Sequence, residues 1–254
     1  MPPKTPPTTI IPSQKPSIIL IHGYRGAPQG LQAIATDLKN SGYDVHLPAI
    51  PPFAGAKPLL EYSPESYADF IASYIKEYRL NRPVLIGHSM GSIITAATAH
   101  LRPELINSRV ILLSPISTRP PKFVAIFAPL TSIAPTRLID YVTTRFLFVK
   151  KSQAKLKDVL RITQQCSSNH TPTYTALKGA TNFSTHYSVS DFSIPKKTLI
   201  IAGEKDRLIK KTATEDLAKN LGADLIFLPH TGHLHNYEKP HETATEILKF
   251  LSRD

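Results

Sequence analysis

The sequence predicts an α/β fold, with a doubly wound, mostly parallel sheet of about six strands and helices on both faces. Three observations support this prediction. Short apolar runs alternate with longer segments of helical periodicity along the chain. The apolar runs lead directly into loops that carry polar side chains, as the buried strands of a parallel sheet do. With 254 residues, the chain is also long enough to bury a sizeable core.

The elements can be placed in order along the chain. Residues 1–16 are rich in Pro, Thr and Ser and are expected to form an extended arm. The apolar runs that predict strands are 18–21, 83–86, 110–113, 199–203 and 225–228. The segments that predict helices are 28–41, 64–80, 90–101, 210–221 and 240–252. The arm leaves little room for further strands before residue 18, which favours a sheet of only about six strands.

The second apolar run ends in a Gly-x-Ser-x-Gly motif, and this motif is the most informative feature of the chain. Gly87, Ser89 and Gly91 stand between a predicted strand and a predicted helix. This context is typical of a nucleophile elbow, a tight turn that holds its serine in a strained conformation and exposes the hydroxyl. The two glycines leave room for neighbouring backbone to pass. The pattern predicts Ser89 as a catalytic nucleophile.

A serine hydroxyl becomes a useful nucleophile only when a neighbouring imidazole accepts its proton, and a carboxylate commonly orients that imidazole. Asp206 lies in the loop after the 199–203 run, at the edge of the sheet where open α/β folds place their chemistry. His233 lies in the loop after the 225–228 run, within Pro-His-Thr-Gly-His. These residues are the candidate acid and base.

The chain resembles the α/β-hydrolase superfamily. The segments that carry the resemblance are His22-Gly23, the elbow at residues 87–91, the stretch from Gly203 to Asp206, and Gly232-His233 followed by Glu238 and Pro240. The resemblance implies Ser89 as nucleophile, Asp206 as acid and His233 as base. It also implies an oxyanion hole formed by the backbone N–H groups of Tyr24 and Met90, and a helical cap inserted into the hydrolase core.

Several residues compete with these assignments. His230 and His235 flank His233, but only His233 has the preceding Gly and the downstream Glu and Pro at the matching spacing. Glu204 is the rival acid and is interpreted as a solvated loop charge. The loop after residues 110–113 offers no carboxylate, which favours Asp206. His22 and His88 are interpreted as structural.

The predicted cap spans residues 115–190 and divides the hydrolase core into residues 17–114 and 191–254. Apolar side chains in the cap could roof an acyl pocket, and its clearest helical stretch is 139–161. The cap holds ten of the basic residues and two acidic ones, or +8 of the net charge of +11. This charge predicts either weak contact with anionic lipid or attraction of an anionic substrate, while a solvated helix face containing Lys150, Lys151, Lys155 and Lys157 is the simpler interpretation.

The rest of the sequence narrows the function classes. We expect no cofactor and no metal, because no phosphate loop, EF-hand or zinc spacing occurs. Nucleic-acid binding is not expected, because no binding module accompanies the basic residues. The N-terminus has no apolar signal region, the single Cys166 excludes an internal disulfide, and a cytoplasmic location is expected.

The resemblance and the candidate residues together predict a serine hydrolase that cleaves carboxylic esters through an acyl-enzyme, of the esterase or monoacylglycerol-lipase type. Thioester hydrolysis, C–C bond hydrolysis, lactone opening or lyase chemistry on the same residues are alternatives. A ligand-binding protein that retains the hydrolase fold is the other class. The sequence does not predict an oligomeric state.

Overall fold

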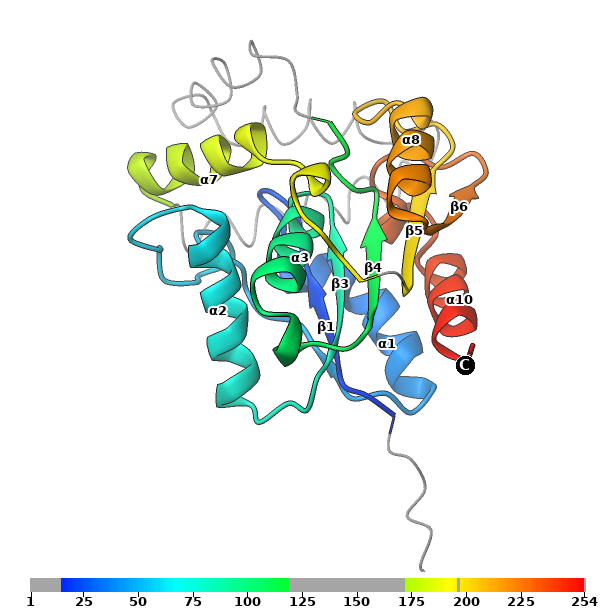
Figure 1. Ribbon diagram of the computed structural model, residues 1–254, viewed down its shortest axis with the longest axis horizontal. Coiled ribbons are helices and arrows are strands. Elements are labelled where there is room, and N and C mark those ends of the chain that lie inside the picture. The colour runs from blue at the N-terminus through cyan, green and yellow to red at the C-terminus, as the bar shows by residue number, and fades with distance from the viewer. Residues whose placement is uncertain (1–14, 119–171, 196, 254) are drawn as a thin grey trace, which may run out of the picture.

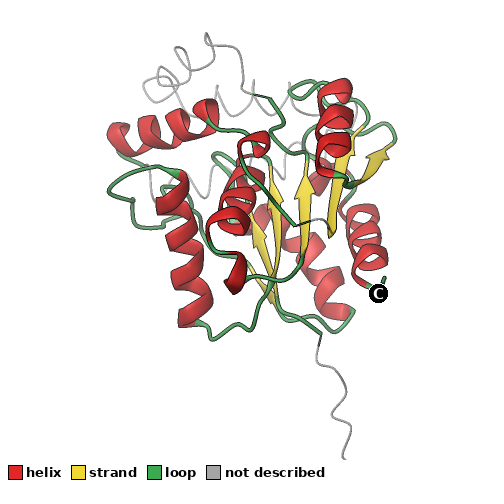
Figure 2. Ribbon diagram, viewed as in Figure 1, coloured by secondary structure: helices red, strands yellow, loops and turns green. Residues whose placement is uncertain are grey.

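The computed structural model describes residues 15–118, 172–195 and 197–253. These residues form one sheet with helices packed on both faces (Figures 1 and 2). The sheet has six strands, all parallel, in the order β2-β1-β3-β4-β5-β6. The strands are β1 (Ile18–Ile21), β2 (Val45–His46), β3 (Val84–His88), β4 (Arg109–Leu113), β5 (Lys197–Gly203) and β6 (Asp224–Leu228). The predicted fold class is confirmed.

The central strands are apolar along their whole length because both of their faces are covered. All four residues of β1 are buried, and so are the last four of β4. Ile18 of β1 aligns with Val45 of β2 on one side and with Val84 of β3 on the other. The alternate residues of a strand point to opposite faces, so each strand contributes to two apolar layers.

The helices divide between these two layers. The helices in the described residues are α1 (Gln32–Asn40), α2 (Pro64–Glu77), α3 (Met90–Leu101), α7 (Tyr174–His186), α8 (Lys211–Leu221), α9 (His235–Glu238) and α10 (Pro240–Leu251), with 3-10 turns at Pro28–Leu31, Pro103–Leu105 and Val189–Asp191. Buried side chains of α2, α3, α7 and α8 form the core on one face, and those of α1 and α10 form the core on the other.

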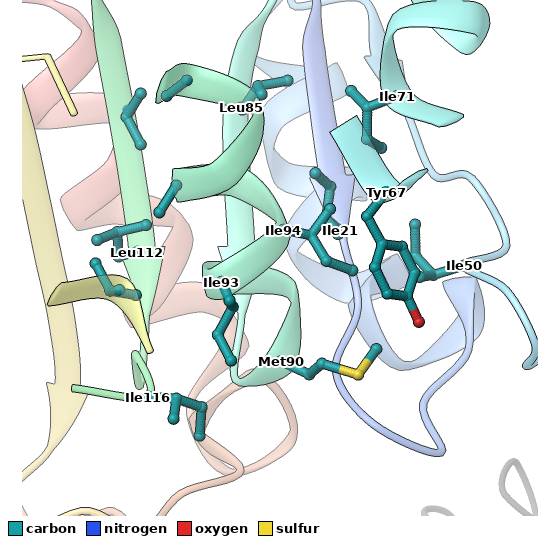
Figure 3. Close-up of a cluster of buried hydrophobic side chains, with 14 of the residues drawn as sticks. Ile21, Ile50, Tyr67, Ile71, Leu85, Met90, Ile93, Ile94, Leu112 and Ile116 are labelled. Carbon is teal, nitrogen blue, oxygen red and sulfur yellow. The ribbon is translucent and has the colours of Figure 1, made fainter. Parts of the chain in front are cut away.

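Figure 3 shows the first of these layers. Ile93 and Ile94 of α3 lie among side chains of the strands, and Tyr67 of α2 lies beside them. Burying an aliphatic side chain of this size contributes about 1.5–3 kcal/mol relative to leaving it exposed. Met90, at the first turn of α3, belongs to the same layer. The layer therefore fixes the helix that directly follows Ser89.

Two helix ends follow from local chemistry. Ser63 precedes α2, and its hydroxyl accepts a hydrogen bond from the backbone N–H of Ser66 (3.2 Å), while Pro64 occupies the first helical position. α8 ends at Gly222, which adopts a left-handed conformation with φ of 61°. The predicted helix at 64–80 ends earlier than expected, at Glu77, because Arg79 takes a positive φ of 52°.

The predicted division into arm, core and cap stays a prediction. Residues 1–14 of the arm and 119–171 of the cap, including the helical stretch predicted at 139–161 and the four lysines between 150 and 157, lie outside the described residues. α7 lies within the predicted cap and is described. None of the helices in the described part of the chain combines the length and the apolar character needed to cross a membrane.

Candidate active site

Ser89 lies at the turn between β3 and α3, in a strained backbone conformation with φ of 54° and ψ of −120°. The strain is imposed by close packing on both sides of the turn. A Cβ atom added to Gly91 would lie 2.2 Å from the carbonyl oxygen of Ile21, and one added to Gly87 would lie 2.2 Å from the carbonyl oxygen of Gly91. Only glycine fits at these two positions, so the expected elbow geometry is present.

The structure brings Ser89, His233 and Asp206 together in one hydrogen-bonded chain. The Oγ of Ser89 lies 2.9 Å from Nε2 of His233. The Nδ1 of His233 lies 2.7 Å from Oδ2 of Asp206. A carboxylate can only accept, so Nδ1 carries the proton and Nε2 is left to accept one from the serine hydroxyl. This tautomer is the one that a serine nucleophile requires of its base.

The surroundings of Asp206 favour its ionised form. Burial raises the pKa of this carboxyl, but its electrostatic interaction with His233, the hydrogen bond from His233 and two backbone hydrogen bonds together lower it below its ordinary value. The backbone donors are the N–H groups of Leu208 (2.8 Å) and Ile209 (3.0 Å), and both point to Oδ1. Oδ1 of Asp206 therefore accepts hydrogen bonds from the loop backbone, and Oδ2 accepts one from His233.

The two predicted oxyanion donors stand at either side of Ser89. Met90 is the first residue of α3, and an N–H at that position has no acceptor within its own helix. Tyr24 follows Gly23 in the loop after β1, and a Cβ atom added to Gly23 would lie 2.9 Å from Cβ of Ser89. The loop that carries Tyr24 is thus packed against the nucleophile. The role of both N–H groups stays a prediction.

The rival residues are engaged elsewhere. Glu204 is exposed and accepts a hydrogen bond from the backbone N–H of His230 (3.1 Å), which is exposed as well. His235 is buried, and its Nδ1 lies 3.1 Å from Oγ1 of Thr243 on α10. Neither contact reaches the hydroxyl of Ser89, and the alternatives raised by the sequence are accounted for by other interactions.

Two further histidines are buried around the site and hydrogen bond to backbone atoms. Nε2 of His22 accepts from the N–H of Ile50 (2.9 Å), and Nε2 of His88 lies 3.0 Å from the carbonyl oxygen of His233. Burial lowers the pKa of His22 to about 4 and that of His88 to about 3. Both rings are therefore neutral at ordinary pH, as expected of histidines with a structural role.

Glu238, which the sequence marked only by its spacing, has a physical task. Its Oε1 accepts a hydrogen bond from the backbone N–H of Gly232 (3.0 Å), the residue before His233. This contact ties α9 to the loop that carries the candidate base. The spacing between Gly232 and Glu238 therefore reflects a constraint on the position of that loop.

Sequence reasoning missed two residues that contact the site. The hydroxyl of Ser92 donates to the carbonyl oxygen of Ser89 (2.5 Å) and accepts from the N–H of Ile116 (3.2 Å). A serine three residues after the nucleophile, in the first turn of a helix, was the available signal. Thr181 contacts Tyr24 from α7, and no motif indicates it.

The described residues contain no group of three or more His, Cys, Asp or Glu side chains arranged to hold a metal ion. The described site itself offers a hydroxyl, an imidazole with one free lone pair, a carboxylate and helix-terminal N–H groups. This set can attack an electrophilic carbon and hold the negative charge that develops on an adjacent oxygen.

Comparisons with known proteins agree with the fold. A model of the alpha/beta hydrolase family matches residues 18–246. An uncharacterized hydrolase, YugF, from Bacillus subtilis is 22% identical over 92% of this chain and 89% of its own length. An esterase from Exiguobacterium antarcticum superposes with a TM-score of 0.82, at 16% identity, covering 94% of this chain and 92% of the esterase. A bromoperoxidase from Bacillus anthracis superposes with a TM-score of 0.80, also at 16% identity and with the same coverage.

Proposed function

This chain belongs to the alpha/beta hydrolase family, and we propose that it is a serine-dependent hydrolase that cleaves carboxylic esters through an acyl-enzyme, of the esterase or monoacylglycerol-lipase type. The observation that carries the proposal is the chain of hydrogen bonds from Ser89 through His233 to Asp206, at 2.9 and 2.7 Å. This chain has the connectivity that converts a serine hydroxyl into a nucleophile.

The proposed reaction begins when Oγ of Ser89 attacks the ester carbonyl carbon. His233 accepts the hydroxyl proton at Nε2, and Asp206 stabilises the imidazolium that forms. The carbonyl oxygen becomes an oxyanion, which the N–H groups of Tyr24 and Met90 are proposed to bind. Each such donor lowers the barrier by about 3–4 kcal/mol.

The intermediate then collapses, and the bond to the leaving alkoxide breaks. His233 returns its proton to that alkoxide, which leaves as the alcohol, while the acyl group remains on Ser89. A water molecule attacks the acyl-enzyme, again with His233 as base, and releases the carboxylic acid. As the acyl bond breaks, His233 returns the proton taken from water to Oγ of Ser89, and this reaction cycle uses only these residues and water.

The Exiguobacterium esterase shares the fold of this chain, and ester hydrolysis is the reaction to test first. A thioester, a lactone or an activated C–C bond would meet the same nucleophile, and the choice among them rests on the substrate pocket. A non-catalytic binding role would leave the strain at Ser89 and the ordered proton path unused.

The proposal is tested with a panel of p-nitrophenyl esters from acetate to palmitate, using the wild type and Ser89→Ala. Turnover that peaks at one chain length in the wild type and disappears in the variant is the expected result. Thermal unfolding of both proteins checks that the variant retains the fold. Labelling with a fluorophosphonate probe, followed by peptide mapping, should place the covalent adduct on Ser89. A folded wild type that neither turns over any ester nor accepts the probe would contradict the proposal.

A further inference from the structure

The side chain of Tyr24 links the loop after β1 to Thr181 on α7, which lies 157 residues further along the chain. Its hydroxyl oxygen lies 2.7 Å from Oγ1 of Thr181. Thr181 is buried, and its own hydroxyl proton is directed to the carbonyl oxygen of Leu177 (2.8 Å). A threonine hydroxyl has one proton, so the hydroxyl of Tyr24 is the donor and Thr181 the acceptor.

α7 is held in place by close packing against α2 and against the segment that precedes α2. The ring of Phe183 on α7 lies 4.5 Å from the ring of Tyr67, measured between centroids. Gly179 faces Tyr62 so closely that an added Cβ atom would lie 2.3 Å from that ring. Figure 1 shows α7 beside the end of α2, at the same side of the molecule. α7 is thus fixed to the body of the protein by its own packing.

The other end of the link is equally close to the nucleophile. Tyr24 is adjacent to Gly23, whose position leaves no room for a side chain beside Ser89. The ring of Tyr24 also makes an edge-on contact with Phe53, with 5.2 Å between centroids. The ring is therefore held at its edge by Phe53 and at its hydroxyl by Thr181, while its backbone N–H is the predicted oxyanion donor.

We propose that Thr181 is a positioning residue for the oxyanion hole: by accepting the hydrogen bond of Tyr24, it fixes the backbone N–H of Tyr24 in the orientation that the oxyanion requires. The inference rests on the proposed function, because it assigns Thr181 a task in that reaction. It also gives α7 a part in catalysis that packing alone would not give it. A donor that is misplaced by a fraction of an ångström loses much of its effect on the transition state and little on substrate binding.

Two substitutions break the link in different ways. Thr181→Val removes the acceptor with almost no change in volume, but it leaves the hydroxyl of the half-buried Tyr24 without this partner. Tyr24→Phe removes the donor, and Thr181 then keeps its bond to Leu177, so no polar group is stranded. Tyr24→Phe therefore keeps the test informative even if Thr181→Val folds poorly.

With the best ester of the panel, each variant should lose about tenfold in kcat with KM nearly unchanged, since the interaction acts in the transition state. The double variant should lose no more than the single ones, because both remove the same link. Thr181→Ser keeps the hydroxyl and should restore most of the kcat lost in Thr181→Val.

Tyr67→Phe serves as the matched control. Tyr67 is also buried, packs on the same helix and donates one hydrogen bond, to the carbonyl oxygen of Pro51 (2.8 Å). It should lower the Tm and leave kcat unchanged. Wild-type kcat in both Thr181→Val and Tyr24→Phe would overturn the inference while leaving the proposed function intact. A wild type without ester turnover would instead overturn the proposed function, and the inference with it.

Discussion

His88, the residue before the nucleophile, is hydrogen bonded to the main chain of the candidate base: its Nε2 lies 3.0 Å from the carbonyl oxygen of His233. The acceptor is a carbonyl, so Nε2 of His88 carries the proton and donates it. The two rings lie 5.4 Å apart, between centroids. The turn that carries the nucleophile thus contacts His233 twice: His88 donates to its backbone carbonyl, and Oγ of Ser89 contacts its ring at Nε2. Two neighbouring residues, His88 and Ser89, thus each hydrogen bond to His233, and only the bond of Ser89 takes part in the proposed proton transfer.

Replacing His88 should therefore affect stability and activity together. His88→Leu leaves the buried carbonyl of His233 without its donor, at a cost of about 1–3 kcal/mol in the free energy of unfolding. The loop of His233 then loses one restraint, and kcat should fall by about tenfold. His88→Gln can still donate from its amide and should recover part of both losses. Chemical denaturation and ester kinetics measure the two quantities, and a His88→Leu protein equal to the wild type in both would contradict the restraint.

The hydrogen-bonded chain at the site makes a sharper prediction about its members. Ser89→Ala should reduce ester turnover by at least about three orders of magnitude, and Asp206→Asn should be nearly as damaging because the base then adopts the wrong tautomer. His230→Ala should leave most of the activity, because His230 is exposed and its hydrogen bond to Glu204 is made by the backbone N–H, which alanine keeps. Rates measured on one ester for all three proteins decide the matter. Loss of turnover in His230→Ala would contradict His233 as the base, and a fully active Asp206→Asn would contradict Asp206 as the acid.

The sequence could predict the sheet and the triad candidates because both leave local signals. Buried parallel strands are continuous apolar runs, and the elbow at residues 87–91 must have glycine where backbone passes at close range. β2 left no such signal, since it has two residues and pairs only at the edge of the sheet. α9 is a single turn of four residues and is also below the length at which periodicity can be recognised.

The supporting contacts were out of reach for a different reason. Tyr24 and Thr181 are 157 positions apart, and His88 and the carbonyl of His233 are 145 apart. Each contact is a single hydrogen bond between residue types that occur throughout the chain. Only the three-dimensional packing of α7 and of the His233 loop brings these atoms within reach. Residues that react can be found by motif, whereas residues that position them depend on the whole fold.

The buried histidines predict how stability depends on pH. Burial lowers the pKa of His22 to about 4, from 6.5 in an unfolded chain, and lowers that of His235 as well. Between pH 6.5 and pH 4 the unfolded chain binds a proton at His22 that the folded protein does not bind. The free energy of unfolding therefore keeps its full value above about pH 6.5 and decreases as the pH falls toward 4. For His22 alone the loss reaches about 3 kcal/mol, from about 1.4 kcal/mol per pKa unit. Asp206, with its lowered pKa, adds a loss in the same direction at still lower pH.

Thermal unfolding from pH 8 to pH 4 measures this dependence, and a variant isolates one contributor. His235→Leu replaces a buried titratable ring by an apolar side chain, and Thr243 still donates to the carbonyl oxygen of Lys239 (2.8 Å). The variant should show a shallower fall in Tm below pH 6.5 than the wild type, with most of the ester activity retained. An unchanged slope would show that protonation of His235 is not linked to unfolding. A Tm that rises on acidification would contradict the whole account.

The elbow itself can be tested at its closest contact. A Cβ atom on Gly91 would lie 2.2 Å from the carbonyl oxygen of Ile21 and 2.8 Å from that of His22, and both acceptors belong to backbone that cannot move without distorting β1 and the loop after it. Gly91→Ala should therefore destabilise the protein by several kcal/mol, on the order of an overpacked core, or prevent folding. Gly222→Ala is the control for an added Cβ atom without close packing: Gly222 has a positive φ, at 61°, but nothing lies within 4 Å of the added atom. This control should cost only about 1 kcal/mol, the strain of a left-handed alanine. If denaturation gave equal losses for the two variants, the tight packing of α3 against β1 would not be what restricts this position to glycine.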